Sequence, residues 1–424
     1  MGYNSEHGIW IYANSHWNTI SHNIVENNSR YGIFLDHSDY NLVSHNEARN
    51  NYSGICVFYG DYDNLENNIA EGNSNNPTWS EGIYLYRCTY ATLDNNIMSG
   101  NKHGFKVGGF SLEHYSTHDI DESNLVDGKP VRYLIGVSNV VVNQDNTDIG
   151  YLRFVSGENI TVENWSMSGS GNGVLMAGVE NGRVENCTFE NNISGVTFSL
   201  TTNSAIENCV FRNGCNGINL TDSDYNTIAG CTVTQTAREG IYLYGNNDNN
   251  LVENNVVGNC GWQGIRLESY SKNNIISKNV VENNGYEGIY VNRCENTTIS
   301  KNMVRYNGQT SNNSGILLKD LSHNSVIDNN LVENHWGYWH YMGGIHISDS
   351  DGVLVCNNTV RYNTNGIKLD WYLYNDVLEN NTVKNCGHGI EFYRNVFNAL
   401  VRYNTIENCG DGIFLNSGST GSTV

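Results

Sequence analysis

The hexapeptide Glu239-Gly240-Ile241-Tyr242-Leu243-Tyr244 contains a short motif that recurs along the whole chain. Its Gly-Ile step, replaced in places by Gly-Val or Gly-Phe, recurs mostly every 22 to 24 residues, with longer steps of 27 to 29. A period of this length predicts a solenoid, in which each repeat buries its apolar face against its neighbours. The glycines are Gly8, Gly32, Gly54, Gly82, Gly104, Gly173, Gly195, Gly217, Gly240, Gly264, Gly288, Gly315, Gly344, Gly366, Gly389 and Gly412.

The residues after each glycine alternate between apolar and variable, as in Ile241/Leu243. A period of two indicates β-strands. A second signal, apolar-x-x-Asn-x-apolar, follows within each repeat, for example Val252, Asn255 and Val257. Three short strands per turn with polar corners describe an all-β, single-stranded parallel β-helix. We predict about 18 rungs and a length on the order of 85 Å at the usual strand spacing.

One asparagine per repeat occupies an inward position, and a buried amide must be hydrogen-bonded. Stacked at the strand spacing of about 4.8 Å, each amide can donate to one neighbour and accept from the other. Asn also tolerates the left-handed backbone of a sharp corner. The predicted column contains Asn23, Asn46, Asn68 and Asn96, then Asn255, Asn279, Asn302, Asn330, Asn358, Asn381 and Asn404. Trp165, Cys187, Cys209 and Cys231 hold this position in mid-chain, where we expect a local change of cross-section.

The regular spacing of the glycines predicts one continuous rod. Residues 1–108 form the first rungs, residues 109–133 an irregular insertion, and residues 134–424 the remaining rungs. The two prolines, Pro77 and Pro130, are expected outside the regular strands, because a strand ladder needs every N–H group. Most of the 11 cysteines occupy equivalent positions of successive repeats, where parallel stacking places their side chains side by side. We therefore expect free, buried thiols and not disulfides.

The chain has a net charge of −21 and a pI near 4.9. This excess of acidic residues disfavours a nucleic-acid partner. It also disfavours a strongly polyanionic substrate, unless calcium bridges the protein and the substrate. It suits a secreted or surface protein. No signal peptide or membrane-spanning stretch is evident, so we expect no membrane insertion. The chain opens inside a rung, and we expect a piece of a longer surface protein or a subunit whose open ends meet neighbouring copies.

Three segments carry a family resemblance: His118-Asp119-Ile120, Asp127-Gly128-Lys129-Pro130-Val131, and Asn159 to Asn164. Together with the Gly-Ile rungs and the Asn column, they resemble NosD-type right-handed β-helices, a branch of the carbohydrate-binding and sugar-hydrolase group that is abundant in archaeal cell-surface proteins. The resemblance implies a right-handed coil in an extracellular or periplasmic protein. NosD proper is a periplasmic factor for copper-site maturation, which makes a copper-related role a minor alternative. The resemblance says little about activity.

The outward positions of the strand after each glycine stack into one long face that mixes aromatic and charged side chains. Sugar rings can stack on such a platform while carboxylates and amines bind hydroxyl groups. The alternative is that exposed strands favour Tyr and Trp for propensity alone. Long corner loops, one containing Trp336 and Trp339, are expected to form a wall beside the face. The predicted glycan-binding residues are Tyr242, Tyr244, Arg266, Glu268, Tyr290, Trp336, Trp339, Trp371 and Tyr393.

An active site, if present, is expected on the same face beside that wall. A lyase or epimerase would use Lys319, Lys368 or His346 as base, Asp370 or Glu391 as carboxylate, and Tyr393 as proton donor. A hydrolase would need two carboxylates about 5 to 9.5 Å apart, for which Asp370 and Glu391 are candidates. Against catalysis, the sequence lacks the Asp-Pro-His-Glu run of uronan epimerases, the paired Asp-Asp of polygalacturonases and the Arg-x-Pro of pectate lyases.

No cofactor is required by these residues. His335, His340 and His346 offer ligands for copper or zinc, but isolated loop histidines are more often solvated, so we predict no transition-metal site. Calcium is possible at acidic turns such as Asp61-Tyr62-Asp63-Asn64 and Asn246-Asn247-Asp248-Asn249.

Two functional hypotheses follow. The first is a non-catalytic extracellular β-helix that is structural, glycan-binding, or both, with a polysaccharide or surface glycan as partner. The alternative is a polysaccharide lyase, epimerase or hydrolase acting near His346 and Asp370. The two differ in whether changes at Lys368 and Asp370 abolish turnover of a polysaccharide.

Overall fold

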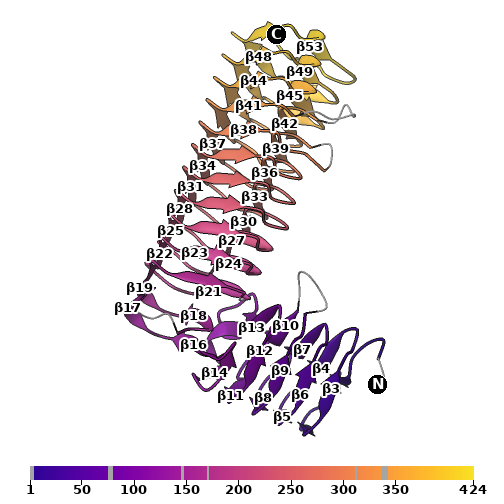
Figure 1. Cartoon of the computed structure of the whole chain (residues 1–424). Helices are drawn as coiled ribbons and strands as arrows, with labels where there is room; N and C mark the ends of the chain where they lie inside the picture. Colours follow the sequence, from indigo (N-terminus) through magenta and orange to yellow (C-terminus); the bar gives the residue numbers. More distant parts are fainter. Residues whose placement is uncertain (1–3, 75–79, 145–147, 170, 311–312, 336–341) are drawn as a thin grey trace. The chain divides into compact units, whose positions relative to one another are not determined.

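The computed structural model describes residues 4–74, 80–144, 148–169, 171–310, 313–335 and 342–424 (Figure 1). The chain is an all-β, right-handed parallel solenoid of about 17 turns, close to the predicted number. The short helix α1 (Glu113–Ser116) interrupts the strands. Contacts divide the chain into two compact units, residues 1–202 and 203–424, a division that differs from the predicted boundaries at 108 and 133.

In the first unit, three parallel sheets surround the interior, and the chain visits them in turn (Figure 1). The sheet that follows the glycines contains β1 (Ile9–Tyr12), β4 (Tyr31–Asp36), β7 (Ser53–Phe58), β10 (Glu81–Tyr86) and β13 (His103–Gly108). The second contains β2 (Thr19–Ser21), β5 (Leu42–Ser44), β8 (Asn64–Glu66), β11 (Thr92–Asp94) and β14 (Asp119–Ile120). The third contains β3 (Ile24–Glu26), β6 (Glu47–Arg49), β9 (Ile69–Glu71), β12 (Ile97–Ser99) and β15 (Leu125–Val126).

The first unit then continues through further strands. β15 pairs antiparallel with β16, which pairs parallel with β18. The remaining strands are β16 (Lys129–Ile135), β17 (Ser138–Val142), β18 (Tyr151–Val155), β19 (Glu158–Glu163), β20 (Ser166–Ser168), β21 (Asn172–Ala177), β22 (Arg183–Glu185), β23 (Thr188–Glu190) and β24 (Ser194–Ser199).

The second unit repeats the three-sheet arrangement. The sheet that follows the glycines contains β27 (Asn216–Thr221), β30 (Ile241–Tyr244), β33 (Ile265–Glu268), β36 (Ile289–Asn292), β39 (Ile316–Lys319), β42 (Ile345–Ser348), β45 (Asn365–Asp370), β49 (His388–Phe392) and β53 (Asp411–Leu415). The next contains β25 (Ala205–Glu207), β28 (Thr227–Ala229), β31 (Leu251–Glu253), β34 (Ile275–Ser277), β37 (Thr298–Ser300), β40 (Val326–Asp328), β43 (Leu354–Cys356), β47 (Val377–Glu379) and β51 (Leu400–Arg402). The third contains β26 (Val210–Arg212), β29 (Thr232–Thr234), β32 (Val256–Gly258), β35 (Val280–Glu282), β38 (Met303–Arg305), β41 (Leu331–Glu333), β44 (Thr359–Arg361), β48 (Thr382–Lys384) and β52 (Thr405–Glu407). β46 (Leu373–Tyr374) pairs with β50 (Val396–Phe397).

The recurring glycine is explained by the close approach of consecutive rungs. A Cβ atom at Gly240 would lie 2.4 Å from Val257 Cγ1 and 2.7 Å from the carbonyl oxygen of Gly264. The next two inward side chains, Ile241 and Leu243, are fully buried. A side chain at the glycine would therefore have to displace either the core or the next rung.

The predicted asparagine ladder is confirmed in both units. The backbone N–H and the Nδ2 of Asn255 both donate to Asn279 Oδ1, at 2.9 and 3.0 Å. Nδ2 also donates to the carbonyl oxygen of Ile228 on the preceding rung, at 2.9 Å. In the first unit the same bonds extend the ladder by one residue, from Asn96 to Asn124. Each amide thus ties together three rungs and is fully hydrogen-bonded.

The structure corrects the expected backbone at this corner. The left-handed residue is the one before the ladder asparagine, such as Asn254, Asn67 or His45, and not the ladder residue itself. Trp165 and Cys187 in the first unit, and Cys209 and Cys231 in the second, are buried as predicted. Cys231 keeps the ladder contact through its backbone N–H, which donates to Asn255 Oδ1.

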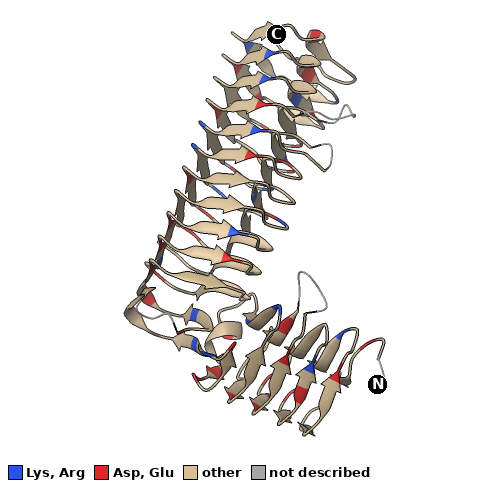
Figure 2. Ribbon diagram, viewed as in Figure 1, with Lys and Arg blue, Asp and Glu red and all other residues tan. Residues whose placement is uncertain are grey.

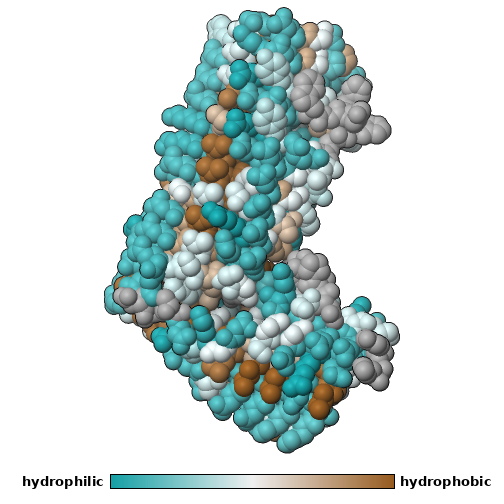
Figure 3. Space-filling model, in the orientation of Figure 1, coloured by the Kyte–Doolittle hydropathy of each residue, from teal (hydrophilic) through white to brown (hydrophobic). Residues whose placement is uncertain are grey.

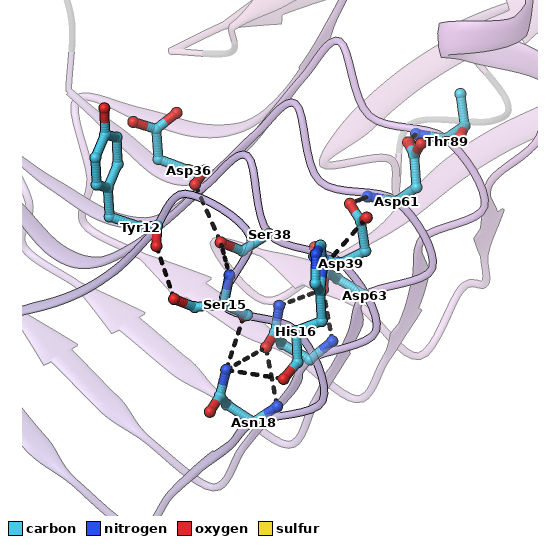
Figure 4. Close-up of polar contacts among 11 residues, drawn as sticks. Tyr12, Ser15, His16, Asn18, Asp36, Ser38, Asp39, Asp61, Asp63 and Thr89 are labelled. Atoms are coloured by element: carbon cyan, nitrogen blue, oxygen red, sulfur yellow. Dashed lines mark hydrogen bonds and ion pairs between the residues drawn. The ribbon is translucent and has the colours of Figure 1, made fainter.

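A further ladder lies at another corner, and it contains a carboxyl group in place of an amide (Figure 4). Asn18 donates to Asn41, and Asn41 donates to Asp63 Oδ1 through its backbone N–H at 2.7 Å and its Nδ2 at 3.1 Å. The second oxygen, Asp63 Oδ2, is buried and has no hydrogen-bond partner among the described residues. Burial raises the pKa of Asp63 to about 7. Asp376 holds an equivalent place in the second unit, where burial raises its pKa to about 8.

Two predictions about the segment that was expected to interrupt the repeats are wrong. The segment 109–133 is not wholly irregular, because β14 and β15 pair in register with β11 and β12. Pro130 lies inside β16, opposite Leu125 in the antiparallel pair, and its carbonyl oxygen accepts a hydrogen bond from Gly150. Pro77 lies outside the described residues. The 11 cysteines, all among the described residues, are thiols and not disulfides, as predicted; ten are buried and Cys409 is partly exposed.

The surface drawn in Figure 3 is mostly hydrophilic, with apolar residues confined to small patches. Within the described residues, no helix has the length and apolar character needed to span a membrane.

Candidate functional site

The outward face of β30, β33 and β36 holds an arginine between two tyrosines. Tyr242, Arg266 and Tyr290 lie opposite one another on adjacent strands. The guanidinium of Arg266 lies 5.1 Å from the ring centre of Tyr242 and 5.5 Å from that of Tyr290. We call Tyr242, Tyr244, Arg266, Glu268 and Tyr290 the tyrosine–arginine patch. The structure brings these five predicted residues together.

Two carboxylates fix the arginine of this patch. Arg266 Nη1 lies 2.9 Å from Glu239 Oε1, and Nη2 lies 2.5 Å from Glu268 Oε2. The hydroxyl of Tyr242 donates to Glu268 Oε2 at 3.2 Å. Charge-assisted bonds from two sides hold the guanidinium in one orientation. The rings of Tyr242 and Tyr290 stay partly exposed, and Tyr244 is exposed.

Glu239 was not among the predicted site residues, although it is the first residue of the hexapeptide from which the fold was predicted. It is fully buried directly before the glycine corner. Glu287 occupies the same place two rungs later, where it accepts a hydrogen bond from Gln263 Nε2 at 3.0 Å. Burial raises the pKa of Glu287. The sequence signal for these groups is a Glu immediately before the recurring Gly.

Four predicted catalytic residues are buried, which contradicts their expected exposure on the platform. His346, Lys368 and Glu391 lie opposite one another on β42, β45 and β49. Lys368 is 0% exposed and Glu391 1%, and Asp370 and His346 are also buried. Two neighbours lie against Lys368. Lys368 Nζ lies 4.0 Å from the ring centre of Tyr393, and a Cβ atom at Gly343 would lie 3.2 Å from Lys368 Cβ.

Burial shifts several pKa values in this cluster. Lys368 Nζ lies 3.4 Å from Glu391 Oε2, yet desolvation lowers the pKa of the lysine. Burial, followed by the charges of Lys368 and Lys319, lowers the pKa of His346 to about 3, so its imidazole is neutral. His346 Nε2 has no hydrogen-bond partner among the described residues. Burial raises the pKa of Asp370, and its bond to Arg394 opposes the shift.

Arg394, which was not predicted, connects the remaining site residues. Its Nε lies 3.2 Å from Asp370 Oδ1. Its guanidinium lies 3.8 Å from the ring centre of Trp371 and 4.8 Å from that of Tyr393. The structure thus brings Asp370, Trp371 and Tyr393 together around one cation. The sequence placed Arg394 directly after a predicted outward tyrosine, but its role depends on reaching across a rung.

The other predicted residues are dispersed. Lys319 is partly exposed, and its Nζ lies 3.7 Å from Asp320 Oδ2. Trp336, Trp339 and His340 lie outside the described residues. His335 is not a solvated loop residue: it is buried in another amide ladder, with Nδ1 3.0 Å from Asn363 Oδ1 and Nε2 3.3 Å from Asn307 Nδ2. Burial lowers its pKa to about 4.

The acidic turn proposed for calcium uses its carboxylates within the fold (Figure 4). Asp61 Oδ1 accepts the backbone N–H of Thr89 at 2.8 Å and its hydroxyl at 2.6 Å. Asp63 accepts from Asn41. In the part of the chain that the structure describes, no group of three or more His, Cys, Asp or Glu side chains is placed to hold a metal ion.

Comparison with known structures supports the architecture. The A-module of the mannuronan C-5 epimerase AlgE4 from Azotobacter vinelandii is 14% identical, with a TM-score of 0.50 over 87% of this chain and 90% of that one. A mutant of the periplasmic alginate epimerase AlgG is 10% identical, with a TM-score of 0.44 over 85% and 77% of the two chains. DFA-IIIase from Arthrobacter chlorophenolicus A6 is 13% identical, with a TM-score of 0.40 over 56% and 67%. At 14% identity, the likeness to the AlgE4 A-module indicates the fold alone.

Comparison of the sequence gives the family. No curated protein sequence matches the chain. Residues 1–127 match the model described as periplasmic copper-binding protein (NosD). Residues 135–265, 216–341 and 285–424 each match the model described as right handed beta helix region. Since these matches together span residues 135–424, more than half of its length, the chain belongs to the right-handed β-helix family.

Proposed function

We propose that the protein is a non-catalytic, extracytoplasmic β-helix protein that binds a polysaccharide through the tyrosine–arginine patch. The observation that carries this proposal is the fixed guanidinium of Arg266 between two partly exposed tyrosine rings. Rings offer apolar faces to the C–H groups of a sugar, and the fixed Arg266 and Glu268 offer a donor and an acceptor to its hydroxyl groups.

The exposure of the two clusters favours binding over catalysis. The tyrosine–arginine patch is open, because Tyr244 is exposed and Tyr242 and Tyr290 are partly exposed. The cluster around Lys368 is closed, since Lys368 and Glu391 expose almost no surface. A sugar can contact the first without any movement of the protein. It cannot contact Lys368 or Glu391 unless Tyr393 or its neighbours move.

The proposed location is the periplasm or the cell exterior. The match of residues 1–127 to a periplasmic protein description and the net charge of −21 both support it. Charged residues are spread along the strands of both units (Figure 2). No copper chemistry is proposed, since no group of three or more potential metal ligands lies together among the described residues.

The test is a binding panel on the full chain with neutral and acidic polysaccharides, measured by depletion from solution and by calorimetry. We expect Tyr244→Ala and Tyr290→Ala to weaken binding at least tenfold. The control is Tyr270→Ala, which removes an exposed tyrosine outside the patch. Retention of no polysaccharide, or equal binding by Tyr244→Ala and the wild type, would refute the proposal.

The cluster around Lys368 supports a second candidate, proton transfer on a bound sugar by a lyase, epimerase or hydrolase. Three groups with shifted pKa values, His346, Lys368 and Asp370, gather there, and such groups concentrate at functional sites. Product analysis on the same panel tests it. Turnover that is lost in Lys368→Met while binding persists would favour this candidate; absence of product from every substrate would refute it.

A further inference from the structure

A buried arginine lies where the first five-stranded sheet of the chain ends. β13 is the last strand of that sheet, and β16, β18 and β21 follow it within the first unit (Figure 1). Arg153 of β18 is 0% exposed and lies opposite Tyr133 and Leu175 on the neighbouring strands. Its Nη2 donates to the carbonyl oxygen of Val107 on β13 at 2.7 Å. The side chain therefore reaches from β18 to the last strand of the preceding sheet.

Three tyrosine rings surround the guanidinium of this arginine. Its Cζ lies 5.0 Å from the ring centre of Tyr115, 5.6 Å from that of Tyr133 and 5.8 Å from that of Tyr151. All three tyrosines are buried, and Tyr115 belongs to α1. The hydroxyl of Tyr133 is already engaged, since it donates to the carbonyl oxygen of Tyr115 at 2.6 Å. Ring faces attract a cation less strongly than a full negative charge does, so they compensate the guanidinium only in part.

Several donors at this position have no partner within the protein. Nε and Nη1 of Arg153 are buried without a hydrogen-bond partner among the described residues, and so is the hydroxyl of Tyr151. No carboxylate of the described residues lies within ion-pair distance of Arg153. Burying a charge without its counter-ion is strongly destabilising, and buried donors in native proteins are nearly always satisfied. These groups therefore need an acceptor that the chain itself does not provide.

The titratable groups packed around Arg153 are neutral. Burial raises the pKa values of Tyr133 and Tyr151, so both phenols keep their protons. Burial also lowers the pKa of His118 to about 4, and the charge of Arg153 adds to this shift. Neither the phenols nor the imidazole supplies the negative charge that the guanidinium lacks.

We propose that Arg153 binds a monovalent anion of halide size, such as chloride, with the hydroxyl of Tyr151 as a second donor. One cation requires one negative charge, and a spherical ion accepts N–H and O–H bonds from several directions. The enclosure by buried side chains excludes phosphate, sulfate and sugar carboxylates by their size. Since the chain as a whole carries −21, the local charge of Arg153 would hold the anion, and not the field of the whole protein. This site does not rest on the function proposed for the tyrosine–arginine patch.

The test compares thermal unfolding of the full chain in sodium chloride, sodium bromide and sodium gluconate at equal concentrations. Gluconate is also monovalent but much larger than a halide, so the ionic strength stays the same while the site stays inaccessible. An ion that binds only the folded state stabilises it, so chloride and bromide at about 0.2 M should raise the midpoint by at least about 3 °C over gluconate. Arg153→Met, which removes the cation, should abolish this difference. Tyr151→Phe should lower the halide affinity, obtained from the midpoint against concentration, at least threefold.

Arg87→Met is the matched control. The guanidinium of Arg87 also lies over an aromatic ring, 4.1 Å from the centre of Phe110, but its side chain is partly exposed. Water can reach it, so this variant should keep the full response to chloride. A direct measurement does not depend on the folding of any variant: a crystal of the wild type soaked in bromide should show an anomalous scattering peak beside Arg153.

The proposal is overturned by equal midpoints in chloride and gluconate, or by a chloride response that persists in Arg153→Met. A bromide-soaked crystal without a peak beside the guanidinium would overturn it as well. A further contrary result is the ultraviolet absorbance of an ionised tyrosine at neutral pH that Tyr133→Phe or Tyr151→Phe abolishes. In that case a phenolate of the chain, and not an ion from solution, would be the partner of Arg153.

Discussion

The two units build the same interior and different exteriors. Inside, both use a glycine corner, branched apolar residues and a hydrogen-bonded amide ladder. Outside, the equivalent strand positions carry Phe34, Phe58 and Tyr84 in the first unit but Arg266, His346 and Lys368 in the second. The interior is fixed by contact between rungs, whereas the outward positions are free to vary. The difference between the two faces is therefore where separate functions can arise.

The two buried lysine–glutamate pairs offer the strongest contrast. Lys368 in the second unit is 0% exposed beside Glu391, whereas the side chain of Lys106 in the first unit retains 12% exposure beside Glu81. Lys368→Met leaves Glu391 buried without its cation, and we expect it to destabilise the second unit by about 3–5 kcal/mol. Lys106→Met should cost about 1–2 kcal/mol, because Lys106 is itself partly exposed and Glu81 keeps a hydrogen bond from the Ser53 hydroxyl. Urea unfolding with hydrogen exchange at β45 and β10 assigns each loss to a unit.

The double variant Lys368→Met/Glu391→Leu is the control for this comparison. Since it removes both charges, it should recover most of the stability lost in Lys368→Met. Equal losses for the two single lysine variants would show that the second cluster is not closed to water as the structure indicates.

The ladder carboxyl groups predict a dependence of stability on pH. A Cβ atom at Gly60 would lie 2.5 Å from Asp63 Oδ2 and 2.7 Å from the Ser38 carbonyl oxygen, so both oxygens face one point. In the second unit, Asn250 Nδ2 donates to the corresponding carbonyl, that of Ser223, at 2.9 Å. Asp63 can make that bond only when protonated. Asp39 and Asp61 lie nearby and add to the preference for the neutral form.

The sign of the effect follows from proton binding. The folded pKa of Asp63, about 7, is above its usual 3.8, so the folded state binds the proton more tightly than the unfolded state. The stability that this proton provides is complete below about pH 4 and is lost as the pH rises to about 7. For Asp376, beside Asp351, the loss continues to about pH 8. Asp63→Asn and Asp376→Asn should each raise the free energy of unfolding by on the order of 2–4 kcal/mol at pH 9, and by little at pH 4.

Unfolding in urea between pH 4 and pH 9 measures this difference. Asn96→Ala, which removes an amide of the other ladder in the same unit without changing a charge, should lower stability equally at both ends of the range. A wild-type stability that does not fall between pH 4 and pH 8, or Asn variants that are no more stable at pH 9, would contradict the protonated ladder.

The glycine corners test whether the two interiors are equivalent. A Cβ atom would lie 2.4 Å from a carbonyl oxygen at Gly54, and 2.4 Å from a valine methyl group at Gly240. Gly54→Ala and Gly240→Ala should each cost about 1–3 kcal/mol through overpacking. Gly412→Ala is the matched control, since nothing lies within 4 Å of its Cβ position. Thermal unfolding of the three variants measures the effect, and a loss at Gly412 equal to the others would rule out rung contact as the cause.

The features that could be predicted from the sequence are those constrained by direct contact between successive rungs. Gly240 and Asn255 recur because neither position accepts another residue cheaply, so a simple period reveals them. Asp63 interrupts a ladder of amides and carries no periodic signal. The left-handed corner lies one residue before the expected one, because the period fixes a spacing but not a backbone angle.

The burial of site residues could not be predicted in the same way. Alternation placed Lys368 and Glu391 on the outward side correctly, but both side chains are buried, and Tyr393 and Gly343 from neighbouring segments lie against Lys368. Arg394 gathers Asp370 and Trp371 through a long side chain whose direction no sequence pattern records. Outward in the sequence pattern is therefore not the same as exposed in the structure.

The smallest expected effect concerns one exposed corner. In the first unit, Trp17, Tyr40, Tyr62 and Tyr90 all have a left-handed backbone, and their rings stack at centre distances of 4.2, 4.8 and 4.7 Å. The same corner of the second unit mostly carries asparagine, as at Asn249, Asn273 and Asn296. Asparagine tolerates this backbone more easily, and stacking offsets the cost for the aromatic residues.

Exchanging residues between the two corners separates the cost of the left-handed backbone from the stabilisation by ring stacking. Tyr40→Asn relieves backbone strain but loses two ring contacts, and we expect a net loss of about 0.5–1 kcal/mol. Asn296→Tyr gains strain with no ring beside it and should cost a similar amount. Asn249→Tyr should cost less, because Tyr225 on the adjacent rung supplies a stacking partner. Thermal unfolding of the three variants gives the order, and a cost for Asn249→Tyr equal to that for Asn296→Tyr would show that stacking does not stabilise this corner.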